Sequence, residues 1–271
     1  MLDVGNDNLF DSALECLRCG DPASKVALTS AFAVAVERGG LDGTSGGAVE
    51  AIAVPGRPSR PQLVAPRQLA QRGLGSVDGR AALVHAVAHI EFNAINLALD
   101  AVYRFRDMPA AFYRDWVRIA ADEARHFGLL TARLAELGFG YGDFDAHDGL
   151  WEMATRTAGA CLDRMALVPR VLEARGLDVT PGMIERLRRV GDDATVAILE
   201  TILREEVDHV AAGSRWFAWC CERDGLDPQA TFLNLLERHL RGGLRGPFNI
   251  EARLRAGFTR DEIARLQDFA A

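Results

Sequence analysis

One pattern occurs twice in this chain and strongly limits what it can fold into. In each copy a lone Glu is followed, 32 or 33 residues later, by the motif Glu-x-x-His. Residues three apart on an α-helix share a face, so each motif directs a carboxylate and an imidazole to one point. Two lone Glu and two such motifs are the ligand set of a two-metal carboxylate site in a four-helix bundle. The six candidate metal ligands are Glu91, Glu123, His126, Glu173, Glu206 and His209.

Each candidate ligand was weighed against a competing residue or interpretation. A single Glu-x-x-His is more often a salt-bridged pair on a solvated helix face, but the chain has two copies and no third. Glu205 adjoins Glu206 and lacks the three-residue spacing to a histidine. Asp163 and Glu152 are alternatives to Glu173, which we favour because its distance to Glu206 repeats the first half. Beyond these ligands, the residues indicate no catalytic group and no cofactor-binding motif.

Composition indicates a helical globular protein. The 271 residues are 49% hydrophobic, 25% charged and only 7% aromatic, with a net charge of −7. No basic stripe signals nucleic-acid binding. Residues 1–7 lack the features of a signal peptide, and we expect no membrane-spanning run. Five cysteines without a secretory signal predict reduced thiols and a cytoplasmic location. For Cys16 and Cys19, a lone Cys-x-x-Cys, helix packing is favoured over a zinc or redox role.

The N-terminal third is predicted to be helical and then extended. Helices are expected over residues 7–18 and 23–37, followed by a glycine-rich connector over 39–47. Residues 54–75 contain four prolines and no helical period. We expect them to form an extended arm along a helical bundle, with a disordered linker as the alternative.

The first ligand set is predicted to lie on a helical hairpin. Helices are expected over 79–106 and 111–137, with the turn at Asp107-Met108-Pro109. Glu91 lies 16 residues before Asp107 and Glu123 lies 16 after it, so an antiparallel hairpin brings the two carboxylates to the same height. Apolar and small residues surround Glu91 on its helix face, where an isolated charge is costly unless it is paired or bound to a cation. They are Val84, Val87, Ala88, Ala94, Ile95 and Ala98.

The second ligand set is predicted with a weaker symmetry. A helix over 150–175 is expected to kink at Pro169, one turn before Glu173, and to stop at Gly176. A short helix is expected to start at Pro181 and reach residue 190, which makes the segment after Glu173 part of a turn. A long helix follows over 192–223. Residues 228–271 are expected to form two or more helices, broken at Gly242-Gly243 and Gly246-Pro247. We therefore divide the chain into an N-terminal segment (1–77), a four-helix bundle (78–225) and a C-terminal extension (226–271), all within one structural unit.

Three further histidines are expected to lie outside the site. His89 points about 160° away from Glu91 around their helix, at 100° per residue. His85 is spaced four residues from His89, and both are expected to make hydrogen bonds on the back face. His147 precedes the predicted third helix and is expected to cap it.

The stretch from Glu91 to His209 resembles the ferritin-like di-iron carboxylate superfamily. The motif at 122–126, Asp-Glu-Ala-Arg-His, matches the (D/E)-E-x-R-H pattern of that superfamily, whereas the second copy has Asp208 where Arg is frequent. Most of the chain is similar to the DUF455 family. Three segments carry that similarity, at 79–91, 147–151 and 164–178. This resemblance implies an all-α, ferritin-like four-helix bundle with an N-terminal arm, extra C-terminal helices and a di-iron site.

The resemblance and the ligand set together imply metal and oxygen chemistry. Carboxylate and imidazole ligands suit two ions of iron, with manganese or a mixed Fe/Mn pair as the alternative. We expect an O2-dependent oxidase or monooxygenase that acts on an unknown substrate and needs an external electron donor. The tRNA hydroxylases of the same superfamily are similar in ligand order and spacing. The alternatives are a ferroxidase or iron-handling protein and a non-enzymatic helical scaffold, and a homodimer is the oligomer considered.

Overall fold

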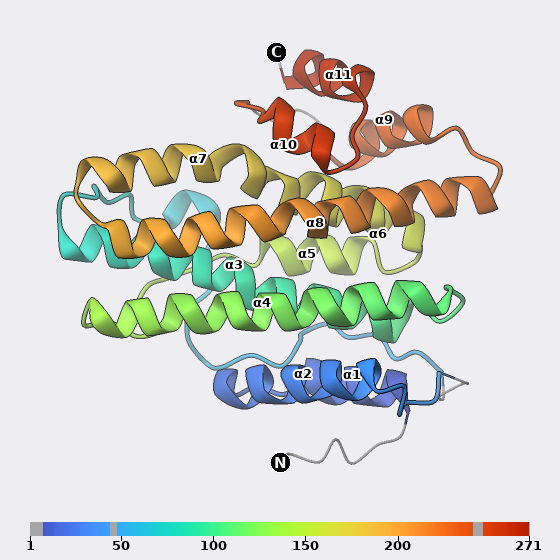
Figure 1. Cartoon of the computed structure of the whole chain (residues 1–271), viewed down its shortest axis with the longest axis horizontal. Coiled ribbons are helices and arrows are strands. Elements are labelled where there is room, and N and C mark those ends of the chain that lie inside the picture. Colours follow the sequence, from blue (N-terminus) through green and yellow to red (C-terminus); the bar gives the residue numbers. More distant parts are fainter. Residues whose placement is uncertain (1–7, 44–47, 241–245, 271) are drawn as a thin grey trace. The chain divides into compact units, whose positions relative to one another are not determined.

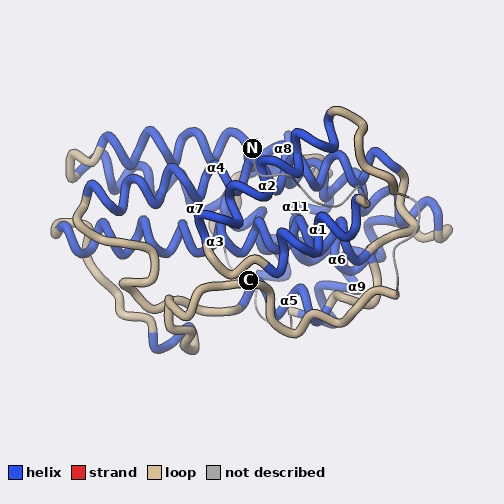
Figure 2. Tube along the Cα trace, turned by 90° about the horizontal axis from the view of Figure 1, so that it is seen from below, coloured by secondary structure: helices blue, strands red, loops and turns tan. Residues whose placement is uncertain are grey.

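In the computed structural model, the described residues are 8–43, 48–240 and 246–270. These residues form helices joined by loops, without a strand among them, and their β contacts are two isolated bridges (Figure 2). The all-α prediction is thus confirmed. Residues 1–7 and the predicted break at Gly242-Gly243 lie outside the described ranges. The chain divides into two compact units, Met1–Thr155 and Arg156–Ala271. The three-segment division stays a prediction.

The first unit is built on a long antiparallel helical hairpin. Its main helices are α1 (Leu9–Arg18), α2 (Pro22–Glu37), α3 (Val77–Arg104) and α4 (Ala110–Glu136), with a 3-10 turn at Pro66–Gln68. Helices α3 and α4 pack along one another, while α1 contacts α3 and α2 contacts α4 (Figure 1). The four helices expected from the sequence in this part are confirmed to within two residues at either end.

Helix α3 is the buried centre of the first unit. The Ser76 hydroxyl caps its start by accepting a hydrogen bond from the Gly79 amide at 3.1 Å. All six apolar residues expected around Glu91 are buried. Among the described residues, α3 is the helix long and apolar enough to cross a membrane, and 78% of its apolar window is buried in the structure. A core helix of a soluble protein meets the same criterion, so this is weak evidence for a membrane span.

The proline-rich arm follows an extended path over the first unit. The Val64 amide donates to the Ala146 carbonyl at 2.8 Å, and the Ala146 amide donates to the Gln62 carbonyl at 2.9 Å. Further back, the Gly56 amide donates to the Leu17 carbonyl at the end of α1 at 2.8 Å. These bonds satisfy backbone groups that a strand partner would otherwise occupy. The segment is therefore a packed arm, and the linker interpretation is wrong.

The second unit contains another antiparallel hairpin and a helical C-terminus. Helix α5 (Gly149–Arg156) precedes it across the unit boundary. The elements of the second unit are α6 (Cys161–Leu167), the π-helical turn η2 (Val168–Glu173), α7 (Ala174–Arg189), α8 (Asp193–Arg223), α9 (Pro228–His239), α10 (Ile250–Arg255) and α11 (Arg260–Ala270). Helices α7 and α8 pack side by side (Figure 1). The expected helices after residue 228 are confirmed.

The expected third helix differs most from the structure. It is interrupted at residues 157–160, and it neither stops at Gly176 nor restarts at Pro181, because α7 passes through both residues. A glycine inside a helix costs about 1 kcal/mol and a proline about 3 kcal/mol. Burial of one Leu or Ile contributes about 1.5–3 kcal/mol, so a continuous apolar face outweighs both. The buried residues of α7 are Ala174, Leu177, Asp178, Thr180, Ile184 and Leu187.

The expected kink at Pro169 takes the form of the π-helical turn η2. Pro169 has no amide hydrogen to donate, and the wider turn accommodates its ring. Gly213 of α8 lies against this ring, and a Cβ atom on Gly213 would overlap the Cβ and Cγ atoms of Pro169. Close approach of α8 to the π turn therefore requires glycine at position 213.

Candidate metal centre

Three ligand candidates meet on the α3–α4 hairpin, and we call Glu91, Glu123 and His126 the first half-site. The His126 Nδ1 atom lies 3.1 Å from Glu91 Oε2 and 3.5 Å from Glu123 Oε2. One ligand atom from each residue lies within 4.8 Å of those of the other two. All three side chains are buried. The turn after Arg104 thus brings the two carboxylates to the same height, as their equal distances from Asp107 predict.

The first half-site favours a positive charge. Burial alone opposes protonation of His126, but hydrogen bonds and charges from Glu123 and Glu91 outweigh it and raise the pKa of His126 to about 11. Two buried carboxylates need a cation between them, whether a proton or a metal ion. A buried cluster of two carboxylate oxygens and one imidazole nitrogen fits a metal of the first transition row.

The other three candidates lie on the second hairpin, and we call Glu173, Glu206 and His209 the second half-site. Glu173 ends the π turn, and the other two residues lie on α8. His209 Nδ1 lies 3.2 Å from Glu206 Oε1, and all three side chains are buried. Helices α7 and α8 turn at Gly191, which is 18 residues after Glu173 and 15 before Glu206.

The weaker symmetry expected for the second half is therefore wrong. Glu173 does not lie close to a helix end, since the chain stays helical from there to Arg189. Both half-sites thus lie on long hairpins, with the histidine Nδ1 atom facing a carboxylate. The residues weighed against Glu173 are less suited to bind a buried ion, because Asp163 is half-buried and Glu152 is exposed.

The remaining histidines near the first half-site have other partners, as expected. His85 stacks on Tyr141, with ring centroids 5.3 Å apart. His89 Nδ1 lies 2.9 Å from the Tyr141 hydroxyl, and its Nε2 lies 3.1 Å from the His147 carbonyl oxygen. Burial lowers the pKa of both His85 and His89 to about 4, so both rings are neutral near pH 7. His147 Nδ1 accepts from the amide of Gly149 at the start of α5.

The chain was compared with known families, curated proteins and solved structures. Residues 18–264 match the family model described as "Protein of unknown function (DUF455)". The chain belongs to the DUF455 family. It is also 47% identical, over 213 residues, to an "Uncharacterized protein" of Haemophilus influenzae, covering 76% of this chain and 74% of that protein. No solved structure matches. The DUF455 resemblance of the sequence is confirmed, and the relation to ferritin-like proteins stays a prediction.

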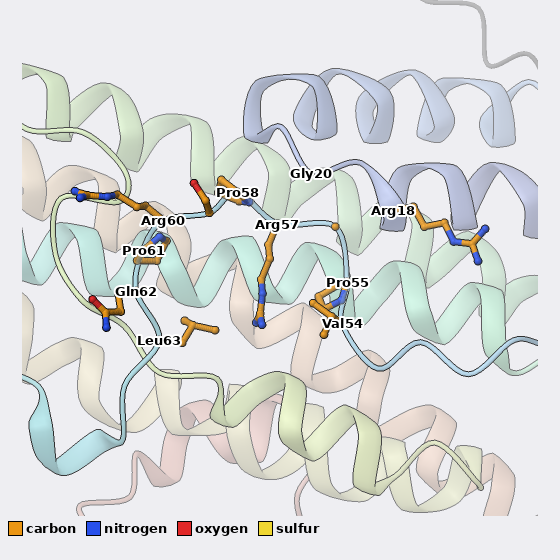
Figure 3. A pocket seen from close by; sticks show the side chains of 12 residues that line it. Arg18, Gly20, Val54, Pro55, Arg57, Pro58, Arg60, Pro61, Gln62 and Leu63 are labelled. Atoms are coloured by element: carbon orange, nitrogen blue, oxygen red, sulfur yellow. The ribbon is translucent and has the colours of Figure 1, made fainter.

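A second hollow of this DUF455 chain lies away from the first half-site. Its volume is about 730 Å³, and the arm lines it together with the end of α1 (Figure 3). Three arginines border it, but Arg18 pairs with Glu50, and Arg57 pairs with Asp148 at 3.0 Å. Figure 3 shows the side chains of Arg18 and Arg60 extending away from one another. The arginines therefore do not converge on one anion.

Sequence reasoning missed two residues that shape the second half-site of this DUF455 chain. Gly213 lies four residues after His209 and admits Pro169, as described above. Arg170 is buried in the π turn although arginine is rarely buried without a partner. An arginine within the otherwise apolar run 165–172 was the available signal, and its partners lie more than 40 residues further along the chain.

Proposed function

We propose that this DUF455 protein is a ferritin-like dinuclear metal carboxylate protein in which the two half-sites together bind two ions. The observation that carries the proposal is the repeated geometry, with a buried His Nδ1 atom 3.1 or 3.2 Å from a buried carboxylate oxygen on each hairpin. Four carboxylates balance the charge of two divalent ions. We favour iron, with manganese or a mixed pair as the alternative, because both ions accept carboxylate and imidazole ligands.

The reaction proposed is oxidation of an unknown substrate with O2, as an oxidase or monooxygenase. A reduced iron pair supplies, on reaction with O2, an oxidant strong enough for C–H hydroxylation or desaturation. Electrons must come from an external donor, because the sequence has no recognisable flavin or nicotinamide motif. The protein's own contribution is to hold the ligands in place and to bury them away from bulk water, which strengthens their electrostatic interactions with a bound cation.

Metal analysis of the purified protein tests this proposal. We expect two ions per wild-type chain by plasma mass spectrometry, and a loss of bound metal in Glu123→Ala. Glu205→Ala is the matched control: it removes a half-buried carboxylate beside Glu206 and should leave two ions bound. A wild-type protein without transition metal, whose stability is unchanged by chelators, would contradict the proposal and support the scaffold alternative.

Oxygen uptake separates the two metal-dependent functions. An oxidase or monooxygenase should consume O2 in proportion to external electrons and substrate. Steady O2 consumption driven by added Fe(II) alone, with ferric iron accumulating on the protein, would instead identify a ferroxidase. The measurement is an oxygen-electrode trace with and without a chemical reductant.

A further inference from the structure

The π turn of the second half-site is attached to the C-terminal helices by one buried cation. The guanidinium of Arg170 lies over three phenylalanine rings, with its central carbon 4.2 Å from the centroid of Phe232, 4.6 Å from that of Phe258 and 4.8 Å from that of Phe217. Its Nη2 atom donates to Glu262 Oε1 of α11 at 2.6 Å. Cation–π contacts and a buried ion pair both depend on geometry, so the box of rings fixes where Arg170 lies.

Glu262, the counter-charge, is itself held in place. Its Oε2 atom accepts from the Thr259 amide at 2.8 Å, and its own amide donates to the Thr259 hydroxyl at 3.0 Å. This reciprocal pair is a capping box at the start of α11. The carboxylate facing Arg170 is therefore positioned by the fold of the C-terminal segment.

A second buried ion pair joins the same two parts but attaches elsewhere. Arg253 of α10 donates to Asp178 of α7 through two bonds of 3.0 and 2.7 Å, and both residues are buried. Arg253 also lies over Phe258, the ring that Arg170 contacts. The C-terminal segment thus holds α7 through Asp178 and the π turn through Arg170.

We propose that Arg170 and Glu262 are positioning residues for the metal ligand Glu173, so that the C-terminal helices set the register of the second half-site. Arg170 and Glu173 belong to one π turn of six residues, with Pro169 of the same turn held against Gly213 of α8. Fixing Arg170 from one side and Pro169 from the other fixes the turn, and with it the carboxylate of Glu173. This inference rests on the proposed two-metal function.

The test compares two variants of the full chain that each neutralise one buried carboxylate. Glu262→Gln removes the charge facing Arg170 and keeps the shape of the side chain, whereas Asp178→Asn does the same for Arg253. Both should lower the melting temperature. We expect only Glu262→Gln to weaken binding of one of two Co(II) ions by tenfold or more, as followed by visible absorption. Amide exchange over residues 171–174 should also accelerate only in that variant.

Two results would overturn the inference. One is unchanged binding of both ions and unchanged exchange at residues 171–174 in Glu262→Gln. The other is an equal effect of Asp178→Asn on binding and exchange, which would show a general structural role. Failure of the proposed function itself is distinct, because wild-type protein would then bind no Co(II). The exchange measurement needs no metal and still decides whether Glu262 holds the π turn.

Discussion

The two hairpins present the same three side chains on different backbones. Glu91 lies in the middle of the continuous α-helix α3, whereas Glu173 ends a π turn whose position depends on Gly213 and Arg170. The distance from Nδ1 to the nearest carboxylate oxygen is nevertheless similar, 3.1 Å in the first half-site and 3.2 Å in the second. A regular helix needs only local packing to direct a ligand, while a special turn needs remote contacts. We therefore expect distant substitutions to affect the second half-site more than the first.

The largest expected effects come from removing one imidazole from each half-site. His126→Ala and His209→Ala should each weaken binding of one ion by at least about 100-fold, beyond the 10–100-fold typical of losing an outer-shell partner. The other ion should stay within about tenfold of its wild-type affinity. Anaerobic Fe(II) titration with calorimetry measures both. If either variant loses both ions together, the half-sites are not separable units of binding.

Next in size is the effect of the carboxylates on stability. Replacing Glu91 and Glu123 together by Met should abolish metal binding at the first half-site. In the presence of a chelator, the same change should be neutral or stabilise the fold by up to about 4 kcal/mol, because buried charges cost more to desolvate than they return. Urea unfolding measures the difference. A clear loss of stability would mean that these carboxylates hold the fold together, as the scaffold alternative requires.

Two glycines allow a matched comparison of the hairpins. Gly213→Ala places a methyl group against Pro169, and we expect it to cost about 1–3 kcal/mol by overpacking and to weaken the second half-site. Gly128→Ala on α4, two residues after His126, meets open space and should gain up to about 1 kcal/mol from helix propensity. Thermal unfolding and metal titration of both variants give the result. Equal effects of the two substitutions would contradict the special role of the π turn.

The smallest predicted effect concerns His85, which has no counterpart on α7 or α8. Burial lowers its pKa to about 4 in the folded chain, against 6.5 when it is exposed, although Asp143 and Asp145 act in the opposite direction. The unfolded chain therefore binds more protons between these values, and the stability present above pH 6.5 is lost as the pH falls toward 4. The loss between pH 7 and pH 5 should be about 2 kcal/mol. His85→Gln should remove this difference in urea unfolding, and an unchanged slope would exclude His85 as its source.

The first half-site was predictable because its signals are local. Asp107-Met108-Pro109 is a true turn, the helices on either side are regular, and the distances of Glu91 and Glu123 from it are equal. The second half-site was harder because Gly176 and Pro181 are usual helix breakers. Burial of Leu177, which lies between them, and of the residues that follow on the same face overrides both signals.

Other features of the second unit depend on contacts that sequence spacing does not reveal. The interruption at residues 157–160 has Gly159 as its only local signal. The partner of Arg170 is Glu262, 92 residues away, and nothing near either residue indicates the pairing. The six ligands could be named from periodicity, whereas the contacts that position Glu173 could not, because they follow from tertiary packing.

The π turn also affects how this helix tolerates insertions and deletions. A π turn spans one more residue per hydrogen-bonded ring than an α-turn does. Deleting one residue from 168–172 would allow an ordinary α-helix to form and would rotate the segments on either side of the deletion by about 100° relative to one another. A chain with such a deletion would keep its helices but turn the Glu173 carboxylate away from Glu206 and His209. Gene length in this short stretch is thus constrained by ligand direction, although the helix itself could absorb the change.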